Sequence, residues 1–158
     1  MKSKILPITV ALCAILALVL VLMLLTGEKE KDFTPPPFEQ NAMAGIPKVP
    51  QEAGYAQADA EAFRFAAAGN LQTQDGSVDV WLTNPEGNDI WLKARILDKN
   101  GQVLGESGLV KEGEYVQTIL LDTVPEHSTE VSLKIMAYEP ETYYSAGAAV
   151  LKTTLVVS

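Results

Sequence analysis

The sequence is poor in the residues that most often carry catalysis or cross-links. Its 158 residues include one cysteine, Cys13, and one histidine, His127. One cysteine cannot form a disulfide within the chain, so the fold must be held by packing. A Ser-His-Asp triad would have to use His127, and a lone histidine in a loop is usually only a solvated side chain. We therefore expect no catalytic residues, no cofactor and no enzyme activity.

Basic residues are also scarce. Lys2 and Lys4 precede an apolar N-terminal stretch, and the remainder carries 10 Lys/Arg against all 20 Asp/Glu. This part of the chain therefore has a net charge near −10. Nucleic-acid phosphates and anionic lipid surfaces would repel such a surface. The composition argues against a nucleic-acid partner and is typical of an acidic, solvated domain.

The carboxylates show no metal-site pattern. Asp75 with Asp79, or Glu139 with Glu141, are the nearest approach to a calcium site, but they lack the dense Asp/Asn ladder of a calcium loop. A carboxylate pair for glycoside hydrolysis needs a cleft, which small domains seldom have. We expect no metal site, and interpret these residues as solvated turn carboxylates.

A long uncharged run opens the chain. No charge occurs from Ile5 to Leu25, which at about 1.5 Å per residue matches the hydrocarbon thickness of a bilayer. Pro7 falls in the first turn, where its missing N–H costs little. The run predicts a transmembrane helix over residues 5–26 after a short N-terminus of residues 1–4, so that the lipid bilayer is a partner of this segment.

The flanking charges suggest an orientation. Lys2, Lys4 and the terminal amine favour a cytoplasmic N-terminus, which predicts a single-pass protein with an extracytoplasmic C-terminal domain. A cleaved signal peptide is the main alternative, with Gly27 as the best cleavage point. A lipoprotein would need a small residue before Cys13, where Leu12 stands instead.

Residues 27–60 are predicted to be a linker. Thr34-Pro35-Pro36-Pro37 opens a stretch rich in Pro, Gly, Ala, Gln and Glu. Consecutive prolines favour polyproline II and exclude a helix or a central strand. We expect a semi-rigid spacer, on which Phe38 and Met43 are the residues suited to docking on the domain or on a partner.

Residues 61–158 are predicted to form an all-β domain. Apolar and polar side chains alternate around Val78–Leu82, Ile90–Ile96 and Val131–Ala137, with turn signals every eight to twelve residues. Asn100-Gly101 predicts a tight hairpin turn of the primed type, for which Asn-Gly supplies the positive φ angles. Asn84 to Asn88 predict a second turn. This pattern favours an immunoglobulin-like antiparallel β-sandwich. The alternation leaves open whether Trp91 is buried or faces the other side of its sheet.

One loop is a candidate partner-binding site. Tyr138, Tyr143 and Tyr144 surround Pro140 at one predicted end of the sandwich. Loops at this position often carry recognition, and tyrosine is enriched at interfaces. The alternative is that these rings pack locally over the strand ends.

Several short motifs carry a family resemblance. These are Gly45-Ile46-Pro47, Asn84-Pro85-Glu86-Gly87-Asn88, Asn100-Gly101, Leu104-Gly105-Glu106-Ser107, Leu109-Val110-Lys111-Glu112-Gly113 and Ala146-Gly147-Ala148. The chain resembles a family of small Firmicutes proteins with an N-terminal membrane helix and a short extracytoplasmic β domain. It departs from the family pattern at Ile90-Trp91-Leu92 and at Glu112-Gly113.

Members of that family are often labelled tRNA (uracil-5-)-methyltransferases. The residues argue against such chemistry, because the chain has no Gly-rich loop between a strand and a helix and no cysteine outside the apolar run. We expect instead a membrane-anchored interaction module for an unknown envelope or surface-assembly partner. The alternative is a structural subunit of a surface assembly that self-associates through strand edges.

Overall fold

The computed structural model describes residues 33–158, and Pro35–Ser158 form one compact unit. The predicted transmembrane segment, residues 5–26, lies outside the described residues. Within the described part of the chain, no helix has the length and apolar character needed to span a bilayer. The unit is all-β, as the alternation predicts.

Ten strands and one short 3₁₀ helix make up the unit. They are β1 (Met43–Ala44), η1 (Gln51–Ala53), β2 (Ala56–Asp59), β3 (Arg64–Ala67), β4 (Leu71–Gln74), β5 (Ser77–Asn84), β6 (Trp91–Asp98), β7 (Val103–Glu106), β8 (Glu114–Leu120), β9 (Thr129–Tyr138) and β10 (Ser145–Val156).

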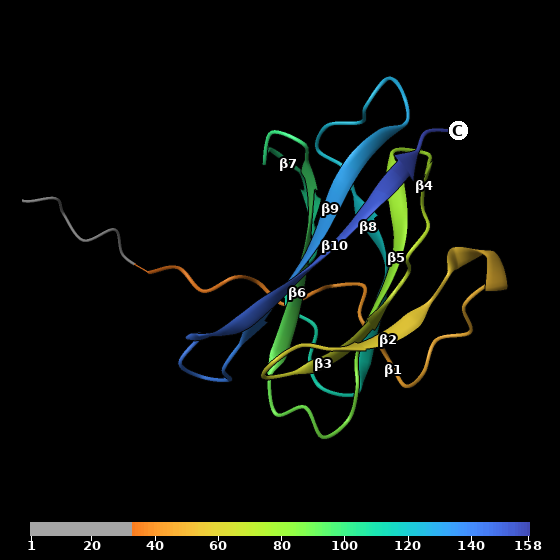
Figure 1. Ribbon diagram of the computed structural model, residues 1–158. Coiled ribbons are helices and arrows are strands. Elements are labelled where there is room, and N and C mark those ends of the chain that lie inside the picture. Colours follow the sequence, from red (N-terminus) through yellow and green to blue (C-terminus); the bar gives the residue numbers. More distant parts are fainter. Residues whose placement is uncertain (1–32) are drawn as a thin grey trace, which may run out of the picture. The chain divides into compact units, whose positions relative to one another are not determined.

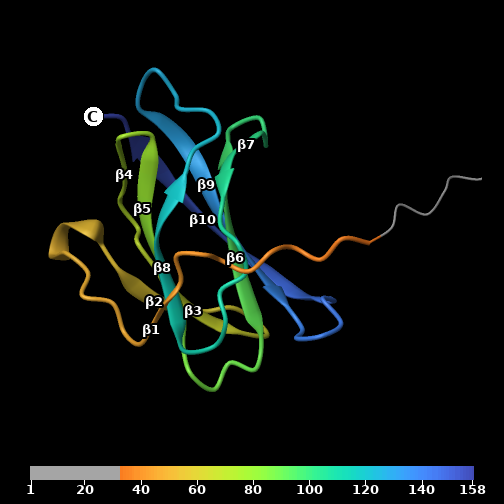
Figure 2. The same ribbon diagram turned by 180° about the vertical axis from the view of Figure 1, so that it is seen from behind.

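The strands form one curled sheet in the order β1-β8-β5-β4-β10-β9-β6-β7 (Figures 1 and 2). All pairs are antiparallel except β4 with β10, which run parallel where Leu71 lies beside Leu155. The β2–β3 hairpin extends the sheet from β5. A bridge between Gly105 and Leu121 connects β7 to the residue that follows β8. The curl therefore lets opposite halves of the sheet enclose one core.

The core follows the alternation in the sequence. Val78, Val80 and Leu82 of β5 face Leu92 and Leu133 of the other half, and all five are fully buried. Removing such side chains from water stabilises the fold by about 2 kcal/mol each. On β6 the alternation places Trp91 on the opposite face from Leu92, where the indole is half-buried. Trp91 is thus not part of the enclosed core.

Turns occur at both predicted places, but Asn100 does not have the positive φ that a primed turn needs. Gly101 has φ +81°, and the Asp98 carboxylate accepts hydrogen bonds from the backbone N–H groups of Asn100 and Gln102, both at 2.8 Å. Both bonds lower the pKa of Asp98, and the bond from Gln102 has the larger effect. The turn at 84–90 instead crosses from β5 to β6. There the buried Asn84 amide donates to the carbonyls of Ile90 and Val110.

The structure differs from the predicted linker over residues 35–60. These residues belong to the folded unit. Here β1 pairs with β8, β2 pairs with β3, and the Tyr55 hydroxyl donates to Thr83 Oγ1 at 2.7 Å. Most apolar residues of the segment are alanines, and its prolines and glycines interrupt the pattern, so alternation gave no signal. Its strands form because neighbouring strands offer unpaired backbone groups.

Residues 35–41, which we call the N-terminal strap, cross the outer side of β6. Phe38 meets Trp91 edge-on with ring centroids 4.7 Å apart. Backbone bonds join Glu39 N–H to the Leu109 carbonyl and Leu109 N–H to the Pro37 carbonyl, at 2.9 and 2.8 Å. Phe38 thus docks on the domain, one of the two outcomes expected of it.

Candidate functional site

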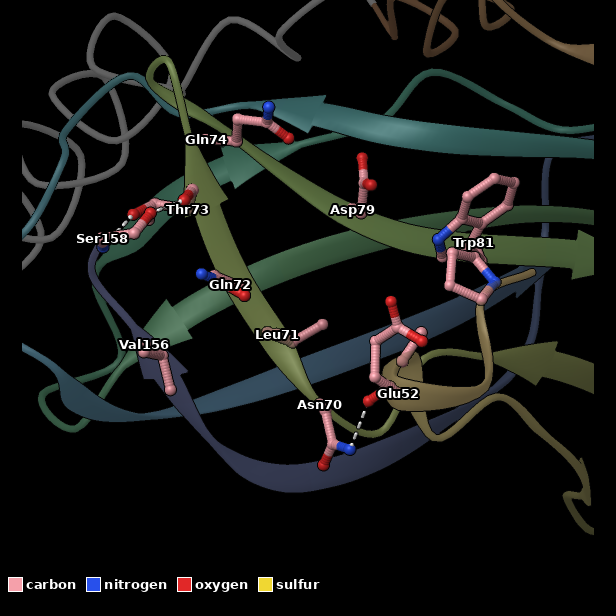
Figure 3. Close-up of a pocket in the computed structure, with 12 residues that line it drawn as sticks. Glu52, Asn70, Leu71, Gln72, Thr73, Gln74, Asp79, Trp81, Val156 and Ser158 are labelled. Atoms are coloured by element: carbon pink, nitrogen blue, oxygen red, sulfur yellow. Dashed lines mark hydrogen bonds between the residues drawn. The ribbon is translucent and has the colours of Figure 1, made fainter.

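The candidate site is a cavity of about 540 Å³ between η1, β4 and β5 (Figure 3). We call it the Trp81 groove. Short η1 forms one wall, and the last residues of the chain, Val156 and Ser158, form part of another. Four side chains carry the polar chemistry on which the site depends, namely Gln72, Gln74, Asp79 and Trp81.

A β-bulge positions Trp81. The pairing of β5 with β8 shifts register between Asp79 and Leu82, and Trp81 has φ +49°. This left-handed conformation costs a bulky residue on the order of 1–3 kcal/mol. The surroundings hold Trp81 in this conformation. The indole stacks on the Tyr115 ring with centroids 6.3 Å apart, and the residue is only 8% exposed. Bulges of this kind re-aim side chains beside binding sites.

The indole N–H of Trp81 is available to a ligand. Every buried side-chain nitrogen and oxygen in the described residues has a hydrogen-bond partner. The indole N–H donates to no acceptor in this part of the chain, so it must be reached by solvent. Figure 3 shows the indole nitrogen on the side of the ring that faces the cavity. Indole is a donor only, so the groove presents one unused donor at its inner end.

Hydrogen bonds on the sheet hold Asp79 at the groove. Its carboxylate accepts from Thr118 Oγ1 at 3.2 Å and, more weakly, from Gln117 Nε2 at 3.4 Å. A carboxylate has about four acceptor positions, so capacity remains for a ligand. The sequence places Asp79 and Trp81 on the polar face of their strand, but it gives no sign of the bulge that brings them to one cavity.

Exposed amides line the β4 side of the groove. Gln72 and Gln74 alternate with buried Leu71 and Thr73, so both side chains face away from the core. Asn70 donates to the Glu52 carbonyl at 2.8 Å, which ties η1 to the start of β4. Because η1 lies in the predicted linker, sequence reasoning missed this wall of the site.

The lining is polar and acidic. It offers carboxylate and amide groups with one indole N–H, and it contains no lysine, arginine, histidine or cysteine. His127 is exposed elsewhere, and no group of three metal-ligating side chains occurs among the described residues. The groove therefore presents hydrogen-bonding groups that a polar ligand can meet.

The three tyrosines of the predicted partner-binding loop have different surroundings in the structure. Tyr143 packs on Trp91 with centroids 5.3 Å apart, and Tyr138 is half-buried beside Met136. Tyr144 is 71% exposed and follows the turn between β9 and β10. Two of the three rings are therefore in local packing, and Tyr144 is the one most open to a partner.

A charged cluster lies on the outer face of β6. Lys93 and Arg95 each contact the Glu106 carboxylate at 2.7 Å, and the Lys93 side chain is nearly buried. Partial burial alone would raise the pKa of Glu106, but the hydrogen bonds from Lys93 and Arg95 outweigh it and lower this pKa. The cluster is internally paired, so we interpret it as structural.

Comparison of the chain with protein-family models and with curated proteins found no match.

Proposed function

We propose that the protein is a membrane-anchored extracytoplasmic interaction module without catalytic activity. Residues 5–26 would anchor it in the cell membrane with the N-terminus in the cytoplasm. The observation that carries the proposal is the Trp81 groove, where an unpartnered donor, a carboxylate and two amides meet. Such a lining can bind and orient a partner through hydrogen bonds.

The strand order supports the more specific fold proposal of an immunoglobulin-like sandwich. One half of the sheet runs β7-β6-β9-β10 and the other contains β4, β5 and β8, and the β9–β10 hairpin extends from one end. In sandwiches of this type, recognition commonly uses end loops or sheet faces. The resemblance to small Firmicutes membrane-anchored β-domain proteins agrees with the same proposal.

Photo-crosslinking in cells would test the proposal. A photoreactive amino acid placed at Gln74, on the groove, should capture an envelope component in the membrane fraction. The same group at Glu130, which is exposed on β9, serves as the matched control and should capture less. Equal capture at both positions, or none at the groove under several growth conditions, would contradict the assignment.

Topology needs its own measurement. Protease added outside spheroplasts should degrade the domain while the N-terminal residues stay protected. Recovery of the intact protein in the cytosolic fraction would refute the anchored arrangement. Release of a shorter chain into the medium would favour the cleaved signal peptide.

A second candidate function, self-association, is favoured by the edge of β10. Residues 145–154 pair with β9 on one side, while on the other side no described strand pairs with them before Leu155. The run contains no proline and one charge, Lys152, and Val150 is 52% exposed. Long edges with few charges are templates for pairing with another chain.

Two lysines would test this second function. The double variant Ala148→Lys/Val150→Lys should convert a concentration-dependent dimer into a monomer in analytical ultracentrifugation, because charge on an edge opposes pairing. The control, Thr123→Lys, adds charge at an exposed loop and should leave the dimer intact. A wild-type protein that is monomeric at every concentration would exclude self-association.

A further inference from the structure

We propose that the Trp81 groove binds a neutral saccharide, such as a short stretch of an envelope glycan. The inference rests on the proposed function and names the ligand class of the same site. It is drawn from the charge of the lining, from the balance of its donors and acceptors, and from the position of Trp81.

The charge of the lining excludes anions. The two ionisable side chains that line the groove are the carboxylates of Glu52 and Asp79. Phosphate-bearing or carboxylate-bearing ligands would meet like charge with no lysine or arginine to compensate. Neutral and cationic ligands remain.

The hydrogen-bonding groups favour hydroxyls over an amine. Gln72 and Gln74 each present both a donor and an acceptor, and the Trp81 indole adds a further donor. A protonated amine offers only donors, so the N–H groups of Gln72, Gln74 and Trp81 would find no acceptor on it. A sugar hydroxyl donates and accepts at once, so it pairs with the Asp79 carboxylate on one side and with an amide or the indole on the other.

The shape of the site is consistent with a sugar chain. The groove has a volume of about 540 Å³, within the range of small-molecule sites. Val156, which is 46% exposed, and the edge of the Trp81 indole supply the apolar part against which the C–H face of a pyranose can lie (Figure 3).

The test uses the full chain in detergent micelles. A Trp91→Phe background leaves Trp81 as the only tryptophan, so its fluorescence reports on the groove. Chitotetraose, cellotetraose and maltotetraose are titrated separately, with tetralysine as the cationic probe. We expect saturable quenching or a blue shift with at least one of the three saccharides, and none with tetralysine.

Variants locate the binding. Asp79→Asn, which keeps the size of the side chain, should weaken saccharide binding about tenfold because a charge-assisted hydrogen bond is lost. Gln72→Ala should weaken it by a smaller factor. Glu130→Gln, on β9, should bind like the parent. Thermal unfolding of each variant, monitored by circular dichroism, checks that the fold is retained.

Three outcomes overturn the inference. One is tetralysine binding that Asp79→Asn abolishes while no saccharide binds, which would make the groove a cation site. Another is saccharide binding unaffected by Asp79→Asn and Gln72→Ala. The third is that none of the three saccharides binds; if the Gln74 photo-crosslinker then still captures a protein, the interaction module stands.

Discussion

The ammonium group of Lys93 lies 2.7 Å from Oε1 of Glu106, and the Lys93 side chain is only 7% exposed while that of Glu106 is 37% exposed. Replacing Glu106 by Gln keeps the shape but leaves a nearly buried ammonium without its counter-charge. We expect the free energy of unfolding to fall by about 2 kcal/mol, less than for a fully buried pair because Glu106 is partly solvated. Denaturant unfolding of Glu106→Gln, with Glu130→Gln as the control, measures this loss of stability. Equal stability of the two variants would show that solvent already screens the pair.

The same pair predicts a pH dependence. The pKa of Glu106 is lowered in the folded protein, chiefly because the hydrogen bonds from Lys93 and Arg95 outweigh the opposing effect of burial. A carboxyl with a lowered folded-state pKa stabilises the fold above its ordinary range, and this stability is lost as the pH falls through the lowered value. The stability difference between wild type and Glu106→Gln should therefore be constant near neutral pH and shrink in acid. A difference that grows on acidification would contradict the assignment.

Trp91 connects the strap to the β9–β10 turn, because its indole contacts both Phe38 and Tyr143. Trp91→Ala should lower the free energy of unfolding by about 2 kcal/mol, since the ring is half-buried and makes two aromatic contacts. Tyr144→Ala should change stability by less than about 0.5 kcal/mol, because its ring is 71% exposed. Chemical denaturation of both variants measures this. A comparable loss in Tyr144→Ala would mean that this ring also packs.

Gly108 permits the strap to lie against the sheet. A Cβ at this position would stand 2.5 Å from the backbone nitrogen of Glu39 and 2.6 Å from its Cα. Gly108→Ala should displace residues 35–41 and speed hydrogen exchange at the amides of Glu39 and Leu109, whose bonds hold the strap. The amides of β9 are the internal control and should keep their protection. Unchanged exchange at Glu39 would show that the strap does not need this close approach.

A fragment that begins at Glu61 should be less stable than one that begins at Pro35. The shorter fragment loses the strap, β1, η1 and β2, together with the Tyr55–Thr83 hydrogen bond. We expect a loss of at least about 3 kcal/mol, the sum expected for a few hydrogen bonds and apolar contacts. Urea titration of both fragments tests the expectation. Equal midpoints and slopes would mean that residues 35–60 add nothing to folding.

Side-chain alternation predicted the all-β class and most of the core. Leu92, Ala94 and Ile96 are buried on one face of β6, as the pattern indicated. The Asn100-Gly101 turn was also readable, because Gly relieves the backbone at a positive φ. These features depend on local sequence, and so they can be read from it.

Features that depend on distant partners could not be predicted. Residues 56–59, Ala-Gln-Ala-Asp, show no apolar stripe, and they form a strand because β3 lies beside them. The bulge at Trp81 depends on how β8 meets β5, which no local pattern records. One wall of the groove comes from η1, inside the predicted linker. The candidate site was therefore invisible in the sequence even though Asp79 and Trp81 stood on the expected face.

The strap also has a mechanical consequence. Residues 35–41 are held by the backbone bonds of Glu39 and Leu109 and by the contact of Phe38 with Trp91, all of them outside the enclosed core. A force that pulls on the chain from its N-terminal side would therefore break these contacts first. Detaching the strap would lengthen the chain by about 24 Å before any core strand is disturbed.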